Sequence, residues 1–171
     1  GKALGNGYAV TAVLGTRDVM QAAQATFISS TFWTERIGSV AALATLDVMQ
    51  EESPWDGIVA AGQGITSRWQ DMAATYDLQL TTSGIASLTG FAFNSPHNLA
   101  YKTLITQRML AQGLLAANSV YLCTAHTPAI IDAYFTALEP CFALIQECEQ
   151  GWDVMKELEG PVCHGGFSRL N

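Results

Sequence analysis

The stretch GKALGNGYAVTAVLG, residues 1–15, contains the local features on which the predicted fold depends. Residues 2–7 are predicted to form a turn, because glycine and asparagine tolerate positive φ angles. Residues 8–15 are mainly apolar without polar alternation, which predicts a strand buried on both faces. With a short helix expected over residues 16–23 and a short strand over residues 27–31, this order indicates the end of a larger α/β domain.

A break in the regular pattern follows the next predicted helix, residues 37–51. The segment ESP, residues 52–54, interrupts it, because proline lacks a backbone donor and restricts the residue before it. We therefore predict two domains. Residues 1–52 are expected to be the end of a large domain with its connecting helix, and residues 53–171 a small C-terminal domain.

The second domain is predicted to alternate helices with short strands. An amphipathic helix is expected over residues 56–76, followed over residues 78–93 by one or two strands interrupted at Gly84. A further strand is expected around residues 120–122. Helices packed on one face of a short sheet define an α+β domain, so the whole chain is predicted to combine α/β and α+β parts.

Two similar motifs mark the starts of the remaining helices. Ser95-Pro96 and Thr127-Pro128 each place a hydroxyl that can cap a helix directly before a proline suited to its first turn. These motifs predict helices at residues 96–111 and 129–149. Pro140 lies inside the second of them, so we expect a kink there or a division into two helices.

The composition argues against several classes of partner. Asp and Glu number 15 against eight Lys and Arg, the net charge is −7, and no basic run occurs, which excludes nucleic acid and anionic membranes as favoured partners. No apolar stretch approaches the roughly 18 residues of a membrane span. The four cysteines form neither a CxxC pair nor a metal-ligand set, which favours free thiols, no metal and a cytoplasmic location. The lone His126 is interpreted as structural.

Lys2 is the candidate catalytic residue. Its amine must be deprotonated to attack an aldehyde, and an apolar strand beside it would favour the neutral amine. The glycines that follow let the backbone turn, so that the long side chain can reach a buried group. The alternative interpretation is an exposed lysine near a chain end.

Three segments, in this order, carry a family resemblance. They are GKALGNGY at residues 1–8, FISSTFWTERIGSVAALATL at residues 27–46 and YLCTAHT at residues 121–127. They resemble the cofactor-lysine turn, the segment leading into an Ala-rich helix, and the last strand and helix start of class III pyridoxal-phosphate (PLP) aminotransferases of fold type I. The similarity is greatest to the glutamate-1-semialdehyde aminomutase-like branch. The resemblance implies a C-terminal fragment that starts at the cofactor lysine, in keeping with a first residue other than Met.

The resemblance also implies roles for individual residues. Lys2 would hold PLP as a Schiff base and would move a proton between the substrate α-carbon and the cofactor. Thr31 would donate to the cofactor phosphate of the neighbouring subunit in a homodimer. The reaction would transfer an amino group from a small amino donor to a carbonyl acceptor. The family's other cofactor residues precede the lysine, so this chain alone is expected to be inactive.

Two departures from the family pattern concern the substrate. Thr34-Glu35-Arg36 stands where the family commonly has Gly-Asn-Pro, and Arg36 either binds a substrate carboxylate or pairs with Glu35 or another carboxylate as scaffolding. The loop before residue 121 is short, and Asn118 lies nearest to the place of a substrate-facing acidic residue in the aminomutase. The alternatives to an aminotransferase are therefore glutamate-1-semialdehyde 2,1-aminomutase itself and a non-catalytic α+β interaction module.

Overall fold

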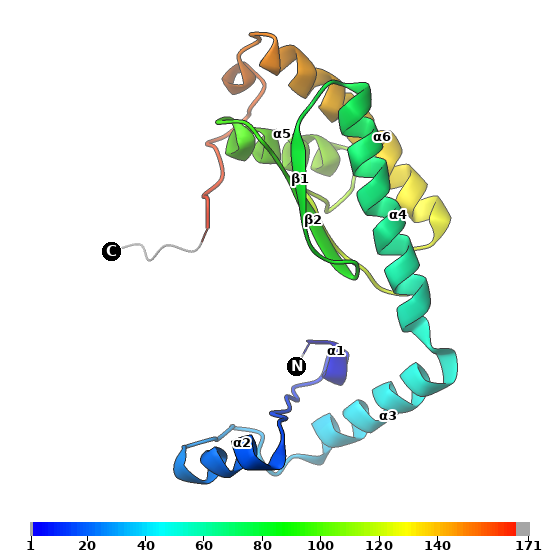
Figure 1. The fold of residues 1–171 in the computed structure, drawn as a ribbon, viewed down its shortest axis with the longest axis vertical. Helices are drawn as coiled ribbons and strands as arrows, with labels where there is room; N and C mark the ends of the chain where they lie inside the picture. The colour runs from blue at the N-terminus through cyan, green and yellow to red at the C-terminus, as the bar shows by residue number, and fades with distance from the viewer. Residues whose placement is uncertain (1, 167–171) are drawn as a thin grey trace. The chain divides into compact units, whose positions relative to one another are not determined.

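The segment around Pro54 separates two long helices. Helix α3 (Arg36–Glu52) ends at Ser53, which adopts a left-handed conformation with φ of 46°, and helix α4 (Pro54–Thr75) begins at the next residue. In this computed structural model, which describes residues 2–166, the chain divides into two units, Gly1–Pro54 and Trp55–Asn171 (Figure 1). The assignment of residues 1–52 and 53–171 to a large and a small domain of a whole protein remains a prediction.

The first unit consists of short helices joined by irregular chain. Its elements before α3 are α1 (Lys2–Gly5), α2 (Arg17–Gln21) and the 3₁₀ helix η1 (Ala22–Ala25). Helix α1 packs against α3. Gly38 of α3 is buried, and a Cβ atom there would lie 2.7 Å from the Ala9 carbonyl oxygen, so glycine permits this close approach. The helices predicted over residues 16–23 and 37–51 are confirmed.

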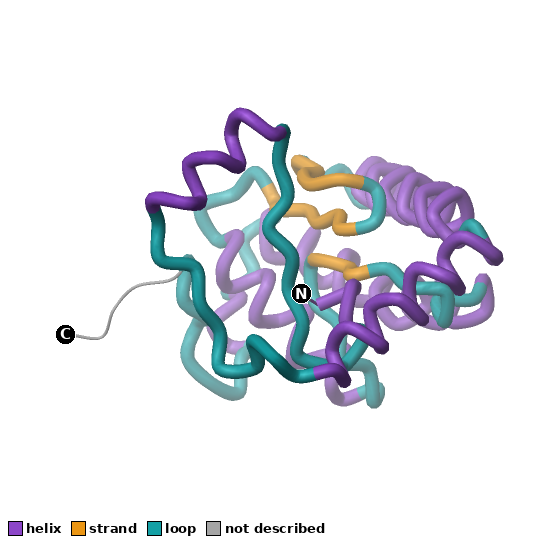
Figure 2. Tube along the Cα trace, turned by 90° about the horizontal axis from the view of Figure 1, so that it is seen from below, coloured by secondary structure: helices purple, strands orange, loops and turns teal. Residues whose placement is uncertain are grey.

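Both strands predicted in the first unit are wrong. Residues 8–15 are almost entirely exposed and form no strand, and residues 27–31 also remain irregular (Figure 2). An apolar β-branched run becomes a strand only when a neighbouring strand supplies its hydrogen bonds, and none of the described residues supplies them here. The turn predicted at residues 2–7 is partly helical: α1 forms first, and Asn6 and Gly7 then turn the chain with φ angles of 44° and 110°.

The second unit is a small antiparallel sheet covered by three helices. Its elements after α4 are β1 (Leu80–Ile85), β2 (Leu88–Phe93), α5 (Asn98–Ala111), β3 (Ser119–Tyr121), α6 (Pro128–Glu149) and the 3₁₀ helix η2 (Val154–Lys156). The strand order is β1-β2-β3, and Leu88 pairs with both Ile85 and Tyr121. This arrangement confirms the predicted α+β domain. Gly84 lies inside β1 with φ of 92°, so the interruption expected there falls instead at the turn between β1 and β2.

The core of the second unit forms around two phenylalanines of β2. Phe91 and Phe93 are buried on the same face of the sheet, since they are two residues apart. The ring centroid of Trp69 in α4 lies 4.8 Å from that of Phe91, and those of Tyr101 in α5 and Phe142 in α6 lie 5.7 Å and 5.2 Å from that of Phe93. All three helices therefore cover one face, and each fully buried side chain of this size stabilises the fold by roughly 1.5–3 kcal/mol.

Helix α6 begins where the capping motif predicts. The Thr127 hydroxyl oxygen accepts a hydrogen bond from the Ile130 backbone N–H at 3.4 Å, and Pro128 occupies the first helical position. The helix continues through Pro140 as one element. Of the two predicted outcomes, the division into two helices is wrong, and the kink stays a prediction. Leu138 and Phe142 on either side of this proline are fully buried, and their packing compensates for the one missing backbone hydrogen bond.

Helix α6 is also long and apolar enough to cross a membrane by length and composition alone, although the sequence was expected to contain no such stretch. Its apolar residues include several that pack in the core of the second unit, among them Phe135, Leu138 and Ile145. A helix that forms part of a protein core meets the same criterion, so this property does not identify a membrane segment.

Candidate functional site

Lys2 lies at the first position of α1 and is exposed. An apolar strand was expected beside the Lys2 amine, but residues 8–15 form no strand and are themselves largely exposed. Within the described residues, the first unit therefore holds Lys2 on a short helix against α3 without enclosing it in apolar surroundings. A lysine in this position is accessible to an aldehyde, and any desolvation of its amine must come from other parts of the protein.

Thr31 opens a turn that leads into α3. It is exposed, and the turn is held by the Phe32 N–H, which donates to the Ser30 hydroxyl oxygen at 3.3 Å, and by the Glu35 N–H, which donates to the Phe32 carbonyl at 3.1 Å. A hollow of about 430 Å³ borders this turn and is lined by Ser29 and Ser30 among other residues of the first unit. Hydroxyl groups and backbone N–H groups therefore gather here, although Thr31 itself does not line the hollow.

Arg36 is the first residue of α3 and is exposed. The ion pairs within residues 2–166 join Arg68 to Asp132 and Arg108 to Glu157, so the scaffolding pair expected between Arg36 and Glu35 does not form in this part of the chain. Binding of a substrate carboxylate and pairing with another carboxylate both remain predictions for Arg36.

Asn118 belongs to the second unit, where it has a structural task. Its side-chain amide N–H donates to the Phe91 backbone carbonyl at 2.7 Å, and its backbone carbonyl accepts from the Phe91 backbone N–H at 2.9 Å. These two bonds extend the pairing of β2 beyond the three residues of β3. The amide predicted to face a substrate is therefore engaged in the sheet, an arrangement that follows from tertiary contacts and has no local sequence signal.

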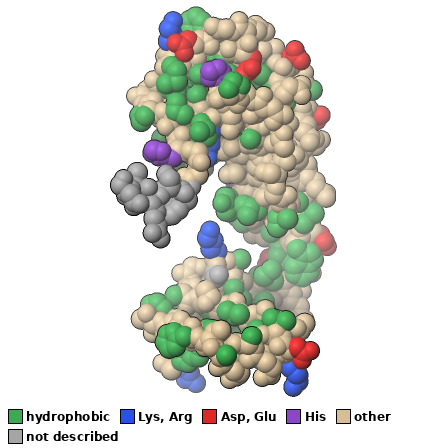
Figure 3. Space-filling view, turned by 60° about the vertical axis from the view of Figure 1, so that its left-hand side comes forward, with side chains coloured by type: hydrophobic (Ala, Val, Ile, Leu, Met, Phe, Trp, Pro, Cys, Tyr) green, Lys and Arg blue, Asp and Glu red, His purple; other side chains and the backbone are tan. Residues whose placement is uncertain are grey.

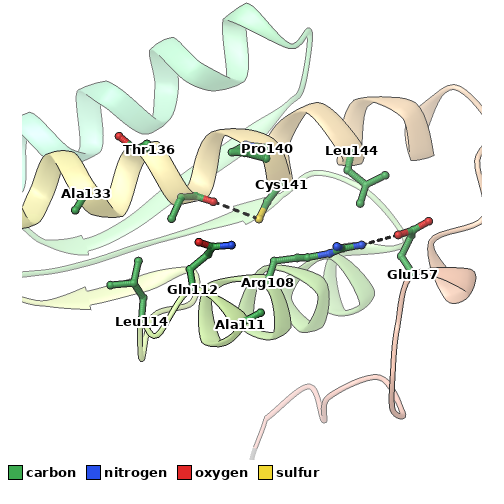
Figure 4. Close-up of a pocket in the computed structure, with 11 residues that line it drawn as sticks. Arg108, Ala111, Gln112, Leu114, Ala133, Thr136, Pro140, Cys141, Leu144 and Glu157 are labelled. Carbon is green, nitrogen blue, oxygen red and sulfur yellow. Dashed lines mark hydrogen bonds and ion pairs between the residues drawn. The ribbon is translucent and has the colours of Figure 1, made fainter.

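A hollow of about 760 Å³ in the second unit lies between α5 and α6 (Figure 4). The Arg108 guanidinium at its edge donates to the Glu157 carboxylate at 2.7 Å, which neutralises the charge of the cation. Burial raises the pKa of the Cys141 thiol in its wall to about 11, so this sulfur stays protonated near neutral pH. The hollow thus offers a paired cation and an unreactive thiol, which does not resemble catalytic machinery.

A contact between Cys123 and His126 was not predicted from the sequence. His126 was taken for a lone structural residue, but its Nδ1 lies 3.3 Å from the Cys123 Sγ. The two residues are three positions apart on the loop between β3 and α6. A Cys-x-x-His spacing before a helix cap was the available signal, but Cys123 and His126 were considered separately.

Comparisons with known proteins agree with the resemblance drawn from the three sequence segments. Residues 1–138 match the family described as aminotransferase class III. Among curated relatives, the aminopentol aminotransferase of Sphingopyxis macrogoltabida is 22% identical over 147 residues, covering 85% of this chain and 35% of that protein. The 3-aminobutyryl-CoA aminotransferase of Cloacimonas acidaminovorans (strain Evry) is 29% identical over 108 residues, covering 63% of this chain and 26% of that protein.

One further curated relative and one solved structure are similar to this chain. The glutamate-1-semialdehyde 2,1-aminomutase of Neisseria meningitidis serogroup B (strain ATCC BAA-335 / MC58) is 24% identical over 149 residues, covering 77% of this chain and 35% of that protein. A solved structure of the FumI protein of Sphingopyxis sp. MTA144, in its PLP internal aldimine form, shares the fold with a TM-score of 0.73 at 22% identity. The structural match covers 90% of this chain and 37% of the FumI chain.

The chain spans about a third of the length of the curated relatives it matches, between 26% and 35%. The match to the family nevertheless extends over most of the chain and includes Lys2, Thr31 and Arg36 of the first unit and Asn118 of the second. The match over residues 1–138 gives the assignment: the chain belongs to the class III aminotransferase family.

Proposed function

We propose that the protein containing this chain is a PLP-dependent aminotransferase in which Lys2 holds the cofactor. The observation that supports this most directly is the position of Lys2, which lies exposed on α1 within the segment that matches the family. The FumI structure of the same fold carries PLP, which supports the choice of cofactor. The substrates would be a small amino donor and a carbonyl acceptor.

The side chains of the first unit fit this cofactor by the chemistry of their donors. A primary amine such as that of Lys2 reacts with an aldehyde, and hydroxyls such as those of Ser30 and Thr31 donate to phosphate oxygens. The acidic partner of the ring nitrogen and the apolar enclosure of the amine are proposed to come from the parts of the protein beyond this chain. Bound PLP supplies a conjugated ring that withdraws electrons from the reacting substrate carbon.

Each residue of the proposed site then has one task. The Lys2 amine takes a proton from the substrate α-carbon as a base and returns it as an acid. Thr31 fixes the phosphate end, and Arg36 at the start of α3 holds a substrate carboxylate with two parallel N–H groups. Asn118, engaged with Phe91 in the sheet, is left without a task in the proposed site.

An assay of the full-length protein tests this function. A panel of amino donors is paired with pyruvate or 2-oxoglutarate, and amino-group transfer is measured for the unaltered protein and for Lys2→Ala. We expect Lys2→Ala to lower the rate by at least about a hundredfold, as for loss of a general base. Lys102→Ala on α5 is the matched control and should retain activity. Retained activity in Lys2→Ala would disprove the role of Lys2.

We also propose a homodimer in which Thr31 serves the neighbouring subunit. The test mixes Lys2→Ala subunits with Thr31→Val subunits. If Thr31 acts across the interface, the mixed dimer contains one site with both native residues, and activity returns above that of either variant alone. If Thr31 acts within its own subunit, each site of the mixed dimer lacks one residue and activity stays low.

An aminomutase is the second candidate, supported by the similarity to the glutamate-1-semialdehyde 2,1-aminomutase of N. meningitidis. An aminomutase moves the amino group within one molecule and needs no external carbonyl acceptor. Incubating the full-length protein with glutamate-1-semialdehyde alone, and locating the amino group of the product by NMR, separates the two activities. The family assignment favours either enzyme over a non-catalytic interaction module.

A cytoplasmic location is likewise proposed. All four cysteines have free thiols in the structure, as expected for a reducing compartment. Cell fractionation followed by detection of the full-length protein tests this proposal, and recovery in a secreted fraction would contradict it.

A further inference from the structure

Cys123 and His126 contact each other on the loop between β3 and α6. The Cys123 Sγ lies 3.3 Å from the His126 Nδ1, and the Cys123 backbone N–H donates to the same nitrogen at 3.1 Å. In the opposite direction, the His126 backbone N–H donates to the Cys123 carbonyl at 3.0 Å. The capping residue Thr127 follows directly, so the helix start fixes one end of this loop.

The backbone bond decides which ring nitrogen carries the proton. A backbone N–H can only donate, so the His126 Nδ1 acts as the acceptor and the proton of the neutral imidazole resides on Nε2. The single lone pair of Nδ1 therefore faces Cys123, where the backbone N–H holds it and the thiol sulfur lies 3.3 Å away. It can accept the thiol proton once the backbone N–H has released it. A base held beside a thiol promotes formation of the thiolate, which is the reactive form of cysteine.

The pair is also open to a reactant. The Cys123 side chain is exposed, and His126 borders a hollow of about 320 Å³ that is lined by Tyr121 and Ile130 among others. The hollow lies beside the pair, so it offers space for the remainder of a molecule whose reactive atom meets the thiol. Its lining joins apolar side chains with polar ones, which suits a small organic molecule.

The other three thiols differ from Cys123 in ways that lower their reactivity. Cys141 and Cys148 are buried, and burial raises the pKa of each thiol. Cys163 is half-buried, and its thiol donates to the Leu99 carbonyl at 3.5 Å, so its sulfur already has a hydrogen-bond partner. Within the described residues, Cys123 thus combines exposure with an imidazole acceptor, and the other three cysteines do not.

We propose that Cys123 is a thiol-exchange site, activated by His126, at which a low-molecular-weight disulfide modifies the protein. The Cys123 thiol proton passes to the His126 Nδ1 as that nitrogen gives up its hydrogen bond to the Cys123 backbone N–H, and the thiolate attacks one sulfur of the disulfide. A new S–S bond forms to Cys123 while the S–S bond of the reagent breaks. The departing thiolate takes the electron pair of that bond and recovers the proton from His126. The Cys123 sulfur is oxidised and the reagent is reduced.

Glutathione disulfide is the probe for this exchange, applied to the full-length protein at neutral pH. Adducts are assigned by peptide mass spectrometry at successive times. Cys123 is expected to be modified first, at least about tenfold faster than Cys163, which serves as the internal control because it is the least buried of the remaining thiols. His126→Ala is expected to slow modification of Cys123 by about tenfold or more, and added imidazole should restore part of the rate.

The same spectra report whether the fold survives, because Cys141 and Cys148 stay unmodified while the core is intact. Equal or faster modification of Cys163 would overturn the proposal, as would an unchanged Cys123 rate in His126→Ala. If His126→Ala exposes the buried thiols, the comparison of Cys123 with Cys163 in the unaltered protein decides the outcome. Cys123→Ser must abolish the fast adduct in every case.

Discussion

At the residue scale, Trp69 joins three parts of the core. It is fully buried, its indole N–H donates to the Tyr134 hydroxyl at 3.0 Å, and its ring contacts that of Phe91. We predict that Trp69→Ala lowers the free energy of unfolding by about 3–5 kcal/mol, because it leaves a cavity and removes a buried donor. Urea denaturation measures this loss. Trp152→Ala is the control, since Trp152 is half-exposed, and its cost should stay within about 1 kcal/mol.

Glu149 provides a pH-dependent contact between the start of α5 and the end of α6. The Tyr101 hydroxyl donates to its carboxylate at 2.6 Å and the Ser95 hydroxyl at 2.7 Å, and these bonds lower the pKa of Glu149 in the folded state. A lowered folded-state pKa stabilises the fold above the unfolded value of about 4.3, and this contribution is lost as the pH falls through the folded-state pKa.

We therefore predict that Glu149→Gln lowers the free energy of unfolding at neutral pH by about 1 kcal/mol, a small value because the carboxylate is exposed. The difference between the variant and the unaltered chain should shrink as the pH falls towards about 3. Urea denaturation at several pH values measures it. Glu147→Gln, two residues earlier on α6, is the control, and a similar pH-dependent loss in that variant would show that the effect is not specific to Glu149.

The candidate site shows what single residues reveal before a structure is known. Lys2 and Thr31 were identified because their segments match a family pattern. Such a pattern is visible in the sequence alone and does not depend on which residues lie nearby in space. The engagement of Asn118 with Phe91 depends on a contact across 27 positions of the chain, which no local pattern encodes. The pairing of Cys123 with His126 is local and was missed because each residue was weighed separately.

At the scale of elements, two glycines of α4 provide a matched test of its packing. A Cβ atom on Gly62 would collide with the Ala86 carbonyl oxygen in the turn between β1 and β2, whereas one on Gly64 would meet no atom within 4 Å. We predict that Gly62→Ala destabilises the second unit by about 1–3 kcal/mol, because the helix and turn must separate. Gly64→Ala should stabilise it by up to about 1 kcal/mol through helix propensity. Thermal denaturation of both variants checks the signs, and equal shifts would contradict the packing described.

The elements that could be predicted from sequence are those whose signals are local. The capping hydroxyl of Thr127 and the amphipathic pattern of residues 56–76 located α6 and α4, because helical hydrogen bonds join residues four apart. Residues 8–15 were wrongly predicted as a strand, since their apolar composition does not reveal whether a neighbouring strand is available. Pro140 was expected to kink α6 or to divide it, but packing on both sides of it keeps the helix continuous.

At the scale of the whole molecule, the two units differ in how much apolar surface they bury. The described residues of the first unit that are buried are Gly5 and Gly38, while side chains such as Leu14, Phe27 and Trp33 are exposed. Figure 3 shows hydrophobic side chains on the molecular surface. The second unit contains the aromatic core around Phe91 and Phe93. The first unit therefore gains little hydrophobic stabilisation from its own contacts.

This difference predicts the course of limited proteolysis of the 171-residue chain. Cleavage should occur first within residues 8–35, where the chain is mostly exposed and its regular structure is limited to the short helices α2 and η1. It should leave a resistant fragment that contains α4 to α6. Mass spectrometry of the fragments locates the first cuts. Initial cleavage within α4 or α6 would contradict the division of stability between the units.

Lys2 is proposed to hold the cofactor of a class III aminotransferase. The most direct measurement is reduction of the full-length protein with sodium borohydride, which makes the bond between lysine and cofactor permanent, followed by peptide mass mapping. We predict that the added mass of the cofactor is found on the peptide that contains Lys2 and is absent from the Lys2→Ala protein. Cofactor fixed to a peptide containing Lys102 or Lys156, or none fixed to the Lys2 peptide, would contradict the claim.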